Sequence, residues 1–483
     1  MSEALHFESI HDLATKIEAG TLSPVELTEA CFARIDALDP SLRAFVTLTR
    51  ERAIAEAKAA ELTIRAGGYR GPLHGIPYVA KDLYNVTGEA TRAGCRLLAD
   101  NIADADAHVV GRLRDAGMVL LGKTHTVQFA FGGVGINHDE GTPHNPWNRV
   151  PFAPGGSSSG TAVAVASGLA PMGLGTDTGG SVRIPASLCG IAGLKTTVGR
   201  VSRSGVYPLS GSLDSVGPLA RTVADCAAVY QALQGADPSG DPSTASQTPH
   251  DVLSSLHRGV SGLRLAFAET AFWDDADDAV VSAVRDTGDV FESLGARVTS
   301  VPFAEAGRVA GGANERHRAL FVAAEACAFN RQLLDEHFDE LDPPVANRMI
   351  NGRTMTGPEY YATQLDWADL RRDALTSFGD IDALIVPTCP ITARSIETID
   401  ETPDTYTAHN GKYLRNTAIG NMLNLCGVSV PCGFDDAHMP IGMTIYARPF
   451  QEEIALRVAQ AYEQATDWHN QRPDLSWAGD VAG

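Results

Sequence analysis

The sequence predicts an α/β fold, and three observations support this prediction. Short apolar runs that resemble buried strands are spread along the chain, from residues 76–80 to residues 441–446. Helical patterns lie between these runs, and the longest cover residues 314–338 and 357–378. Hydrophobic residues make up 44% of the chain and charged residues 20%, which is typical of a globular protein with a large core. Strands and helices that alternate in this way favour a sheet with helices packed on it.

The first part of the chain, residues 8–66, has a helical pattern. Ser23, Pro24, Val25 and Glu26 form a capping box with proline at the first helical position, so a helix is expected to begin there. A further helix, rich in alanine, is predicted over residues 50–64. We expect this part to act as a scaffold.

The next part, up to residue 220, alternates short strands with helices. In chain order, the pattern predicts a strand at 76–80, a helix at 106–116, a strand at 118–121, a helix at 159–168, a strand near Leu174 and a short helix at 184–189. Residues 195–220 are predicted to be rich in loops and to close over a site.

Residues 234–250 contain many Pro, Ser, Gly and Asp residues and almost no apolar ones, so they mark the clearest break in the chain. After the break, strands are predicted at 263–267, 296–301, 383–387, 428–431 and 441–446, and further helices at 277–294 and 451–466. The later part is therefore also of the α/β class.

The most informative stretch is rich in serine and glycine. Residues 155–160 are all Gly or Ser, and Thr176-Asp177-Thr178-Gly179-Gly180-Ser181 follows an apolar run. If the glycines take unusual φ values, the N–H groups of residues 178–181 converge on one point and form an anion-binding nest. A nest beside a serine hydroxyl suits a tetrahedral acyl intermediate. The alternative is a glycine-rich connection without chemistry.

Lys81 is the second unusual feature, because it ends an otherwise apolar run. A charged lysine in such surroundings is costly unless it is paired. One interpretation is a structural lysine that pairs with Asp82 or another carboxylate. The other is a catalytic lysine whose pKa is lowered by burial until the neutral amine accepts a proton.

Several blocks resemble the amidase signature family, whose members are Ser-cisSer-Lys amidohydrolases. They include PGGSSSG, GTDTGGSVRIPA and GIPYVAKDLYNVTG, and their order matches the family from about residue 5 to residue 470. The resemblance implies the family fold, a large mixed central sheet covered by helices on both faces. It also implies one integrated catalytic domain with four segments: N-terminal helices (1–65), a signature core (66–235), a variable α/β region that shapes the pocket (236–380) and the C-terminal part of the core (381–483).

The resemblance also implies roles for particular residues. Ser181 corresponds to the nucleophile, Ser157 to the bridging serine after a cis peptide, and Lys81 to the base. The N–H groups of Thr178, Gly179, Gly180 and Ser181 would form the oxyanion hole, and Ala130 and Ser157 would contact the substrate. The family usually has asparagine at the position of His125 and an acidic residue at that of Gln128.

The function implied by this resemblance is hydrolysis of a linear amide C–N bond through an acyl-enzyme. We expect a small-molecule amide as the substrate, and carbamates and esters suit the same chemistry. The alternative is the amidase subunit of a glutamyl- or aspartyl-tRNA amidotransferase, which would release ammonia from glutamine. Specificity is expected to depend on residues 300–420, where the sequence carries no recognisable signature.

Two other classes are weaker. Gly156-Ser157-Ser158-Ser159-Gly160 fits the G-x-S-x-G pattern of α/β-hydrolases with Ser158 as nucleophile, but the preceding segment, with Pro154 and Gly155, is a poor strand. Late histidines (His409, His438 and His469) leave that class open. A phosphate-binding loop is weaker still, because no G-K-[ST] follows the glycines.

Charge and cysteine content give the remaining expectations. The net charge of −21, from 59 acidic and 38 basic residues, disfavours direct contact with nucleic acid. Eight scattered cysteines without a C-x-x-C pair suggest reduced thiols in a cytoplasmic protein, and residues 1–9 show no signal peptide. No cofactor, metal or membrane contact is expected, and a homodimer is compatible with the sequence.

Overall fold

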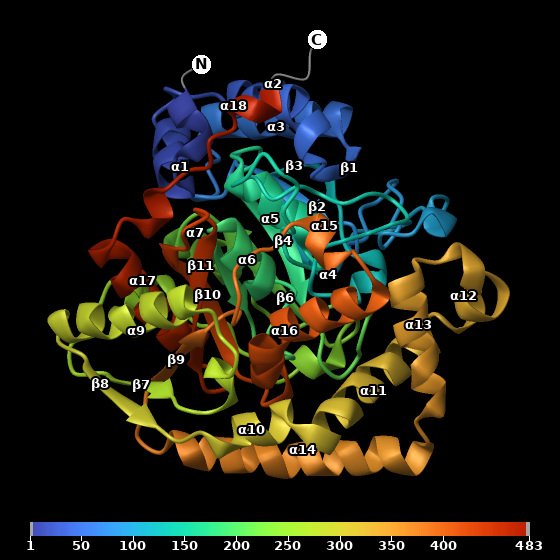
Figure 1. Cartoon of the computed structure of the whole chain (residues 1–483). Helices are drawn as coiled ribbons and strands as arrows, with labels where there is room; N and C mark the ends of the chain where they lie inside the picture. Colours follow the sequence, from blue (N-terminus) through green and yellow to red (C-terminus); the bar gives the residue numbers. More distant parts are fainter. Residues whose placement is uncertain (1–2, 480–483) are drawn as a thin grey trace.

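A single sheet of eleven strands runs through the molecule. The computed structural model describes the backbone of residues 3–479, and the side chains of these residues except 3–4 and 312–316. In the sheet the strands follow the order β1-β3-β2-β4-β6-β5-β10-β11-β9-β7-β8. Figure 1 shows the sheet in the middle of the molecule, the N-terminal helices above it and the long helix α14 below it.

The strands are short and mostly buried. Their bounds are β1 Phe45–Leu48, β2 Pro77–Lys81, β3 Val119–Thr124, β4 Met172–Asp177, β5 Ala192–Lys195, β6 Ser215–Ala220, β7 Arg264–Ala268, β8 Arg297–Val301, β9 Ala383–Pro387, β10 Cys426–Phe434 and β11 Pro440–Ala447.

The helices of more than six residues account for most of the remaining regular structure. Their bounds are α1 Ile10–Glu18, α2 Pro24–Leu42, α3 Arg50–Arg65, α4 His108–Asp115, α5 Ser159–Ala166, α6 Arg183–Cys189, α7 Val223–Leu233, α9 Asp278–Ser293, α10 Ala304–Ala310, α11 Gly312–Phe329, α13 Pro343–Asn351, α14 Gly357–Phe378, α16 Pro403–Met422 and α17 Glu452–Ala465. Shorter helices include α8 Leu253–Leu256, α12 Arg331–Glu336, α15 Ile396–Ile399 and α18 Ser476–Gly479.

The sheet is mixed, as predicted. Strand β2 runs parallel to β3 and β4, whereas β4, β6, β5, β10, β11 and β9 are joined by antiparallel pairs, and β9, β7 and β8 are again parallel. Strands β7 and β8 come from the region after the break, yet they extend the same sheet. The division into four segments remains a prediction.

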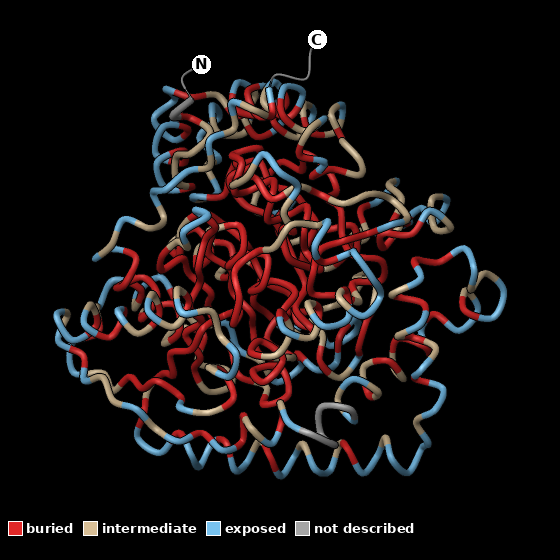
Figure 2. The backbone as a smooth tube through the Cα atoms, in the orientation of Figure 1, coloured by how far each residue is buried: buried red, intermediate tan, exposed pale blue. Residues whose placement is uncertain are grey.

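Alternating residues of β2 show that both faces of the sheet are covered. Tyr78 and Ala80 pack in a hydrophobic cluster with α4 and α7, whereas Val79 packs in another cluster with α2 and α5. Figure 2 shows buried backbone throughout the centre and exposed backbone along α14. All eight cysteines are buried and free, and no helix in the described part of the chain is long and apolar enough to cross a membrane.

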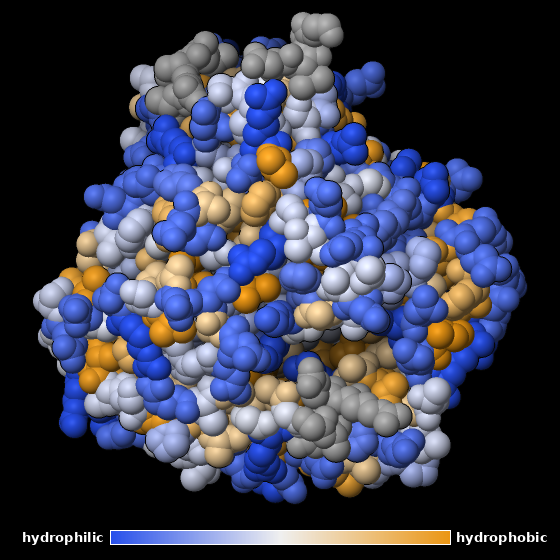
Figure 3. Space-filling view, in the orientation of Figure 1, coloured by the Kyte–Doolittle hydropathy of each residue, from blue (hydrophilic) through white to orange (hydrophobic). Residues whose placement is uncertain are grey.

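The surface is largely polar on the face that Figure 3 shows, with scattered hydrophobic side chains. Among the exposed large hydrophobic residues, Tyr361 and Leu365 lie on α14, whose buried residues are only Thr363, Leu370, Ala374 and Phe378.

Three sequence-based predictions about elements need correction. Residues 196–214 are irregular, as predicted, but residues 215–220 form β6, which pairs with both β4 and β5 in the sheet. The helical pattern over 314–338 is two helices, α11 and α12, separated at Asn330. Residues 45–48, inside the region predicted to be helical, form the edge strand β1, which pairs with β3.

Candidate active site

The serine-glycine turn brings three buried segments together. The peptide bond between Gly156 and Ser157 is cis, as the family resemblance implies, and α5 follows two residues later. A Cβ atom on Gly156 would lie 2.8 Å from the backbone nitrogen of Gly135. Only glycine therefore fits where this turn meets the loop at Gly135.

Lys81 ends β2 and points its amine at this turn. Its side chain is fully buried, and Nζ donates hydrogen bonds to Ser157 Oγ (2.7 Å) and to Thr176 Oγ1 (2.8 Å). Burial lowers the pKa of Lys81 to about 7, although the nearby Asp214 and Asp177 act in the opposite direction. A sizeable fraction of the amine is therefore neutral near pH 7.

The alternative partner for Lys81, Asp82, is engaged elsewhere. Its carboxylate lies 2.6 Å from Nζ of Lys123, and both of these side chains are buried. Lys123 Nζ also donates to the carbonyl of Ala90. Asp82 therefore pairs with Lys123 and not with Lys81, whose amine contacts the hydroxyl groups of Ser157 and Thr176 instead.

The second turn places four backbone N–H groups in a row. The N–H groups of residues 178–181 form no hydrogen bonds within the described part of the chain. Gly180 has φ +138°, and a Cβ there would lie 2.1 Å from Thr417 Oγ1. Donors without a partner among the described residues, at Ser181 and the three residues before it, are what an oxyanion site requires.

A buried ion pair supports this turn from behind. Both Arg183 and Asp177 are fully buried, and two guanidinium nitrogens of Arg183 lie 3.0 Å from the two carboxylate oxygens of Asp177. Asp177 also accepts hydrogen bonds from the backbone N–H groups of Val182 and Arg183, so it caps the N-terminus of α6.

A backbone hydrogen bond joins the turn that contains Ser157 to the turn that contains Ser181. The N–H of Ser158 donates to the carbonyl of Ser181 at 3.2 Å. No hydrogen bond joins the Ser181 hydroxyl to Ser157 among the described residues. Catalytic hydrogen bonds often form fully only when substrate is bound.

Ser181 opens into a cavity of about 390 Å³. Ala130, the predicted contact residue, lines this cavity together with Thr178 and Gly179. Phe129 and Ala130 have positive φ values (51° and 58°), which turn this segment sharply at the cavity wall. The rest of the wall consists mainly of residues from α11, α13 and α16: Arg318, Ala319, Leu320, Val322, Ala323, Arg348, Asn351, Thr407, Asn410, Gly411, Leu414, Ala418 and Met422.

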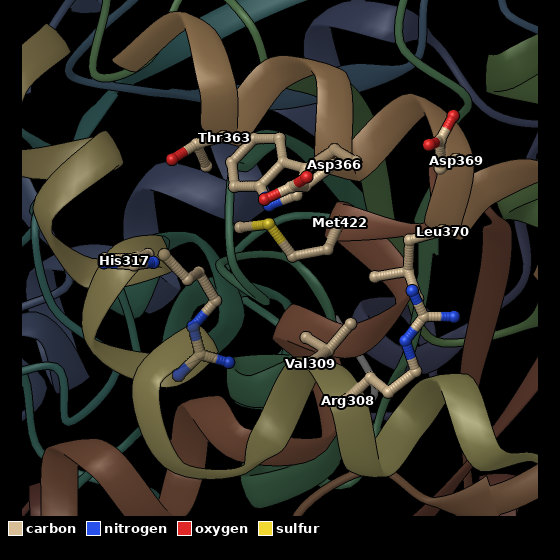
Figure 4. Close-up of a pocket in the computed structure, with 10 residues that line it drawn as sticks. Arg308, Val309, His317, Thr363, Asp366, Asp369, Leu370 and Met422 are labelled. Atoms are coloured by element: carbon tan, nitrogen blue, oxygen red, sulfur yellow. The ribbon is translucent and has the colours of Figure 1, made fainter. Parts of the chain in front are cut away.

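A second cavity of about 290 Å³ adjoins the first, because Arg318 and Met422 line both. Figure 4 shows Thr363, Asp366 and Asp369 on α14 across from Arg308 on α10. The active-site cavity therefore continues into a more polar space between α10 and α14.

Sequence reasoning missed two groups of residues at the site. Thr176 is the second partner of Lys81, although it lies in the motif that carries Ser181. Helix α16 was not predicted, yet Thr417 on it donates to the carbonyl of Gly179 at 2.7 Å. The capping box of Thr402 and Thr405, with Pro403 at the first helical position, is the signal that could have located α16.

Comparisons with known proteins decide the family. The Amidase family model matches residues 26–456. The chain belongs to this family. It is 38% identical to a glutamyl-tRNA(Gln) amidotransferase subunit of Roseiflexus sp. (strain RS-1), over 98% of this chain and 99% of that protein. It is therefore an amidase-signature enzyme that hydrolyses amide C–N bonds.

Solved structures of family members agree with this fold. One of them belongs to a vestigial protein complex that reveals the evolutionary origins of an s-triazine catabolic enzyme. It is 33% identical to this chain, the TM-score is 0.86, and the match covers 95% of this chain and 98% of that one. The native peptide amidase from Stenotrophomonas maltophilia is 30% identical with a TM-score of 0.83, over 97% and 98% of the two chains.

The relatives correct the prediction about partners. The chain was expected to act on a small-molecule amide without direct contact to nucleic acid. Curated relatives that match almost its whole length, including one from Geobacter metallireducens at 36% identity, are subunits of a glutamyl-tRNA(Gln) amidotransferase. Net charge misled here, because it is a property of the whole surface and does not exclude a local or subunit-mediated contact. The comparisons favour the alternative function over the free-standing amidase.

Proposed function

We propose that this protein is the ammonia-releasing amidase subunit of a glutamyl-tRNA amidotransferase, with Ser181 as nucleophile. The single observation that carries the chemistry is the buried contact of 2.7 Å between Lys81 Nζ and Ser157 Oγ, beside a turn, residues 178–181, whose N–H donors have no partner in the described part of the chain. The names and the full-length match of the relatives support the assignment to an amidotransferase. The eight buried thiols support a cytoplasmic location.

The proposed reaction has two stages. Ser181 Oγ attacks the carboxamide carbon while its proton passes through Ser157 to neutral Lys81, and the N–H groups of residues 178–181 bind the oxyanion. The C–N bond then breaks, the amine leaves with a proton as ammonia, and the acyl group stays on Ser181. Water attacks the ester by the same relay and releases the acid. Ala130 and Ser157 line the path of the substrate.

A second candidate is an amidase for a larger, apolar acyl group. The observation that favours it is the cavity itself, because most residues lining its 390 Å³ are apolar, including Leu320, Val322, Leu414 and Met422. Glutamine, by contrast, carries two charged groups at its far end. The peptide amidase relative also supports this candidate.

The test is to trap the acyl-enzyme. The purified chain is mixed with glutamine or with an aliphatic amide, quenched with acid, digested and analysed by mass spectrometry, while ammonia release is measured in parallel. We expect the acyl mass on the peptide that contains Ser181, and we expect Ser181→Ala to lose both the adduct and ammonia release. A glutamyl adduct supports the first candidate, and an aliphatic adduct alone supports the second.

Ser158→Ala is the matched control. Ser158 is equally buried and is the serine that an α/β-hydrolase mechanism would use. Activity in Ser158→Ala together with inactivity in a folded Ser181→Ala, as judged by circular dichroism, supports the proposal. Activity in Ser181→Ala together with inactivity in a folded Ser158→Ala would identify Ser158 as the nucleophile and reject the proposal.

A further inference from the structure

Asp214 carries a carboxylate that the proposed reaction does not use. It contacts the nest, the run of backbone N–H groups of residues 178–181. It directly precedes β6, whose first residue, Ser215, pairs with Asp177 at the end of β4. Asp214 therefore lies next to the point where the chain leaves β4 and enters the nest. Its Oδ1 accepts a hydrogen bond of 2.5 Å from the hydroxyl of Thr178, the first residue of the nest.

The other oxygen of Asp214 holds a different segment. Oδ2 accepts hydrogen bonds of 3.0 Å from the backbone N–H groups of both Leu209 and Ser210. Leu209 lines the active-site cavity. One carboxylate thus joins the first residue of the nest to the loop that forms part of the cavity wall.

The same loop is anchored on its far side by Glu325 of α11. The hydroxyls of Ser210 and Ser212 both donate to its carboxylate, the second at 2.6 Å. Tyr360 of α14 donates to the same carboxylate at 2.6 Å. A continuous chain of hydrogen bonds therefore runs from the nest through Asp214 and residues 209–212 to α11. Val322 and Ala323, which line the cavity, precede Glu325 on the same helix by about one turn.

We propose that Asp214 is a positioning residue that fixes Thr178, and with it the oxyanion donors, relative to the substrate-binding wall. This inference rests on the proposed reaction at Ser181. Donors for an oxyanion are effective because they are already oriented when charge develops on the carbonyl oxygen. The only side-chain hydrogen bond of Thr178 goes to Asp214 among the described residues, so loss of either group frees the start of the nest.

Asp214 has a second consequence, because its charge acts on Lys81. Asp214 and Asp177 both favour the protonated amine, but Asp177 is paired with Arg183. Burial raises the pKa of the Asp214 carboxyl, whereas Arg203 acts on it in the opposite direction. Tyr84 also lies in the field of Asp214, and burial raises the pKa of that phenol well above its usual value.

The experiment compares Asp214→Asn with Thr178→Val in the full chain, with the amide that the trapping experiment identifies. Thr178→Val loses the hydrogen bond between the two side chains but keeps the charge. Asp214→Asn loses the charge, and its single acceptor oxygen cannot serve both the Thr178 hydroxyl and the N–H groups of Leu209 and Ser210. We expect kcat to fall about 10- to 100-fold in each, with KM changed by less than about threefold, because the nest acts mainly on the transition state. Thr178→Ser should recover most of the activity that Thr178→Val loses.

The pH profile separates positioning from a general loss of structure. In the wild type, kcat/KM should rise with pH through about 7 as Lys81 loses its proton. In Asp214→Asn the rise should move to lower pH by about one unit, since a nearby negative charge is gone. In Thr178→Val, which keeps the charge of Asp214, the rise in kcat/KM should occur at the same pH as in the wild type. The double variant should lose less kcat than the product of the two single losses, because both changes disrupt the same set of contacts around Thr178.

Wild-type kcat and an unmoved profile in folded Asp214→Asn would overturn the inference. So would additive losses in the double variant. Both results leave the proposed function intact as long as Ser181→Ala is inactive. If Asp214→Asn does not fold, as judged by circular dichroism, Thr178→Val and Thr178→Ser decide the question, and equal kcat in these two would overturn the inference.

Discussion

The two sides of the active-site cavity are built in different ways. On one side lie Lys81, Ser157 and Ser181, which are almost fully buried: Lys81 is the last residue of β2, and the two serines lie in the turns before α5 and after β4. On the other side lie α11, α13 and α16, where lining residues such as Ala319 and Thr407 are exposed. The first side is therefore built on the sheet, and the second is formed by helices at the opposite wall of the cavity.

This difference separates chemistry from selectivity. A lysine that must be neutral and donors that must be oriented need surroundings that exclude water and do not move. A wall that selects an acyl group needs only a suitable shape, and its helices tolerate changes at exposed positions. Substitutions on the first side should therefore affect all substrates alike, whereas substitutions on the second should change the preference among them.

The largest effect is expected from Lys81→Met. Methionine has a similar volume but accepts no proton, so amide hydrolysis should fall about 10²- to 10⁴-fold for every substrate. Steady-state rates with two amides of different size measure this directly. A loss for one amide only would contradict the assignment of Lys81 to the chemistry.

Lys123→Met is the matched control for Lys81→Met. Both lysines are fully buried, but Lys123 pairs with Asp82 at 2.6 Å. Its removal leaves a buried carboxylate without its partner, which should cost about 3–5 kcal/mol of the free energy of unfolding. Chemical denaturation should therefore show a much larger loss of stability for Lys123→Met than for Lys81→Met, and the reverse order would show that the two roles are exchanged.

A selective effect is expected on the helical wall. Ala319 lies on α11 and lines the cavity, so Ala319→Phe should fill part of it. We expect kcat/KM for a long-chain amide to fall about 100-fold relative to that for acetamide, as is typical when a pocket loses room for a few methylene groups. Competition between the two amides measures the ratio.

Ala368→Phe provides the comparison for Ala319→Phe. Ala368 is also an exposed alanine on a helix, α14, but it does not line either of the two adjoining cavities. This variant should leave the ratio unchanged. An equal drop in both variants would mean that the added ring acts on stability or solubility and not on the cavity.

The sequence predicts the buried side of the cavity well, because its signals are local. Glycines in the two turns, a lysine at the end of an apolar run and an acid that can pair with Arg183 are each visible within a few residues. Asp177 and Arg183, which form the buried ion pair in the structure, are only six positions apart in this motif.

The parts that were missed depend on distant neighbours. Strand β6 contains Gly217 and Pro218, which favour a loop, but Gly217 lies so close to β5 that a Cβ would be 1.9 Å from the Leu194 carbonyl oxygen. Helix α16 buries polar residues that break an amphipathic pattern. Asn421 on α16 donates to Asp177 and accepts from Arg183, a role that the sequence alone does not reveal.

The smallest effect is expected at Gln128, where the family usually has an acid. The buried Gln128 amide donates to Asp139 at 3.2 Å and accepts from the N–H of Asp342 at 3.0 Å. Asp342 also bonds His138, and this contact raises the pKa of His138 to about 9. Gln128→Glu keeps the acceptor but turns the donor into a second oxygen facing Asp139, so we expect a loss of about 1–2 kcal/mol in the free energy of unfolding at pH 7.

The loss should depend on pH in a defined direction. A glutamate held against Asp139 has a folded pKa above its unfolded value of about 4.3, so the folded state binds the extra proton and the variant loses stability as pH rises through this range. Near pH 4 the protonated carboxyl of the Gln128→Glu variant donates to Asp139 much as the amide does, and the variant should approach the wild type. Gln332→Glu is the control, because Gln332 is exposed and contacts Glu336 one turn away. Its cost should stay at about 0.2–0.5 kcal/mol, and an equal cost in both variants would show that the buried amide at position 128 contributes no more than a surface one.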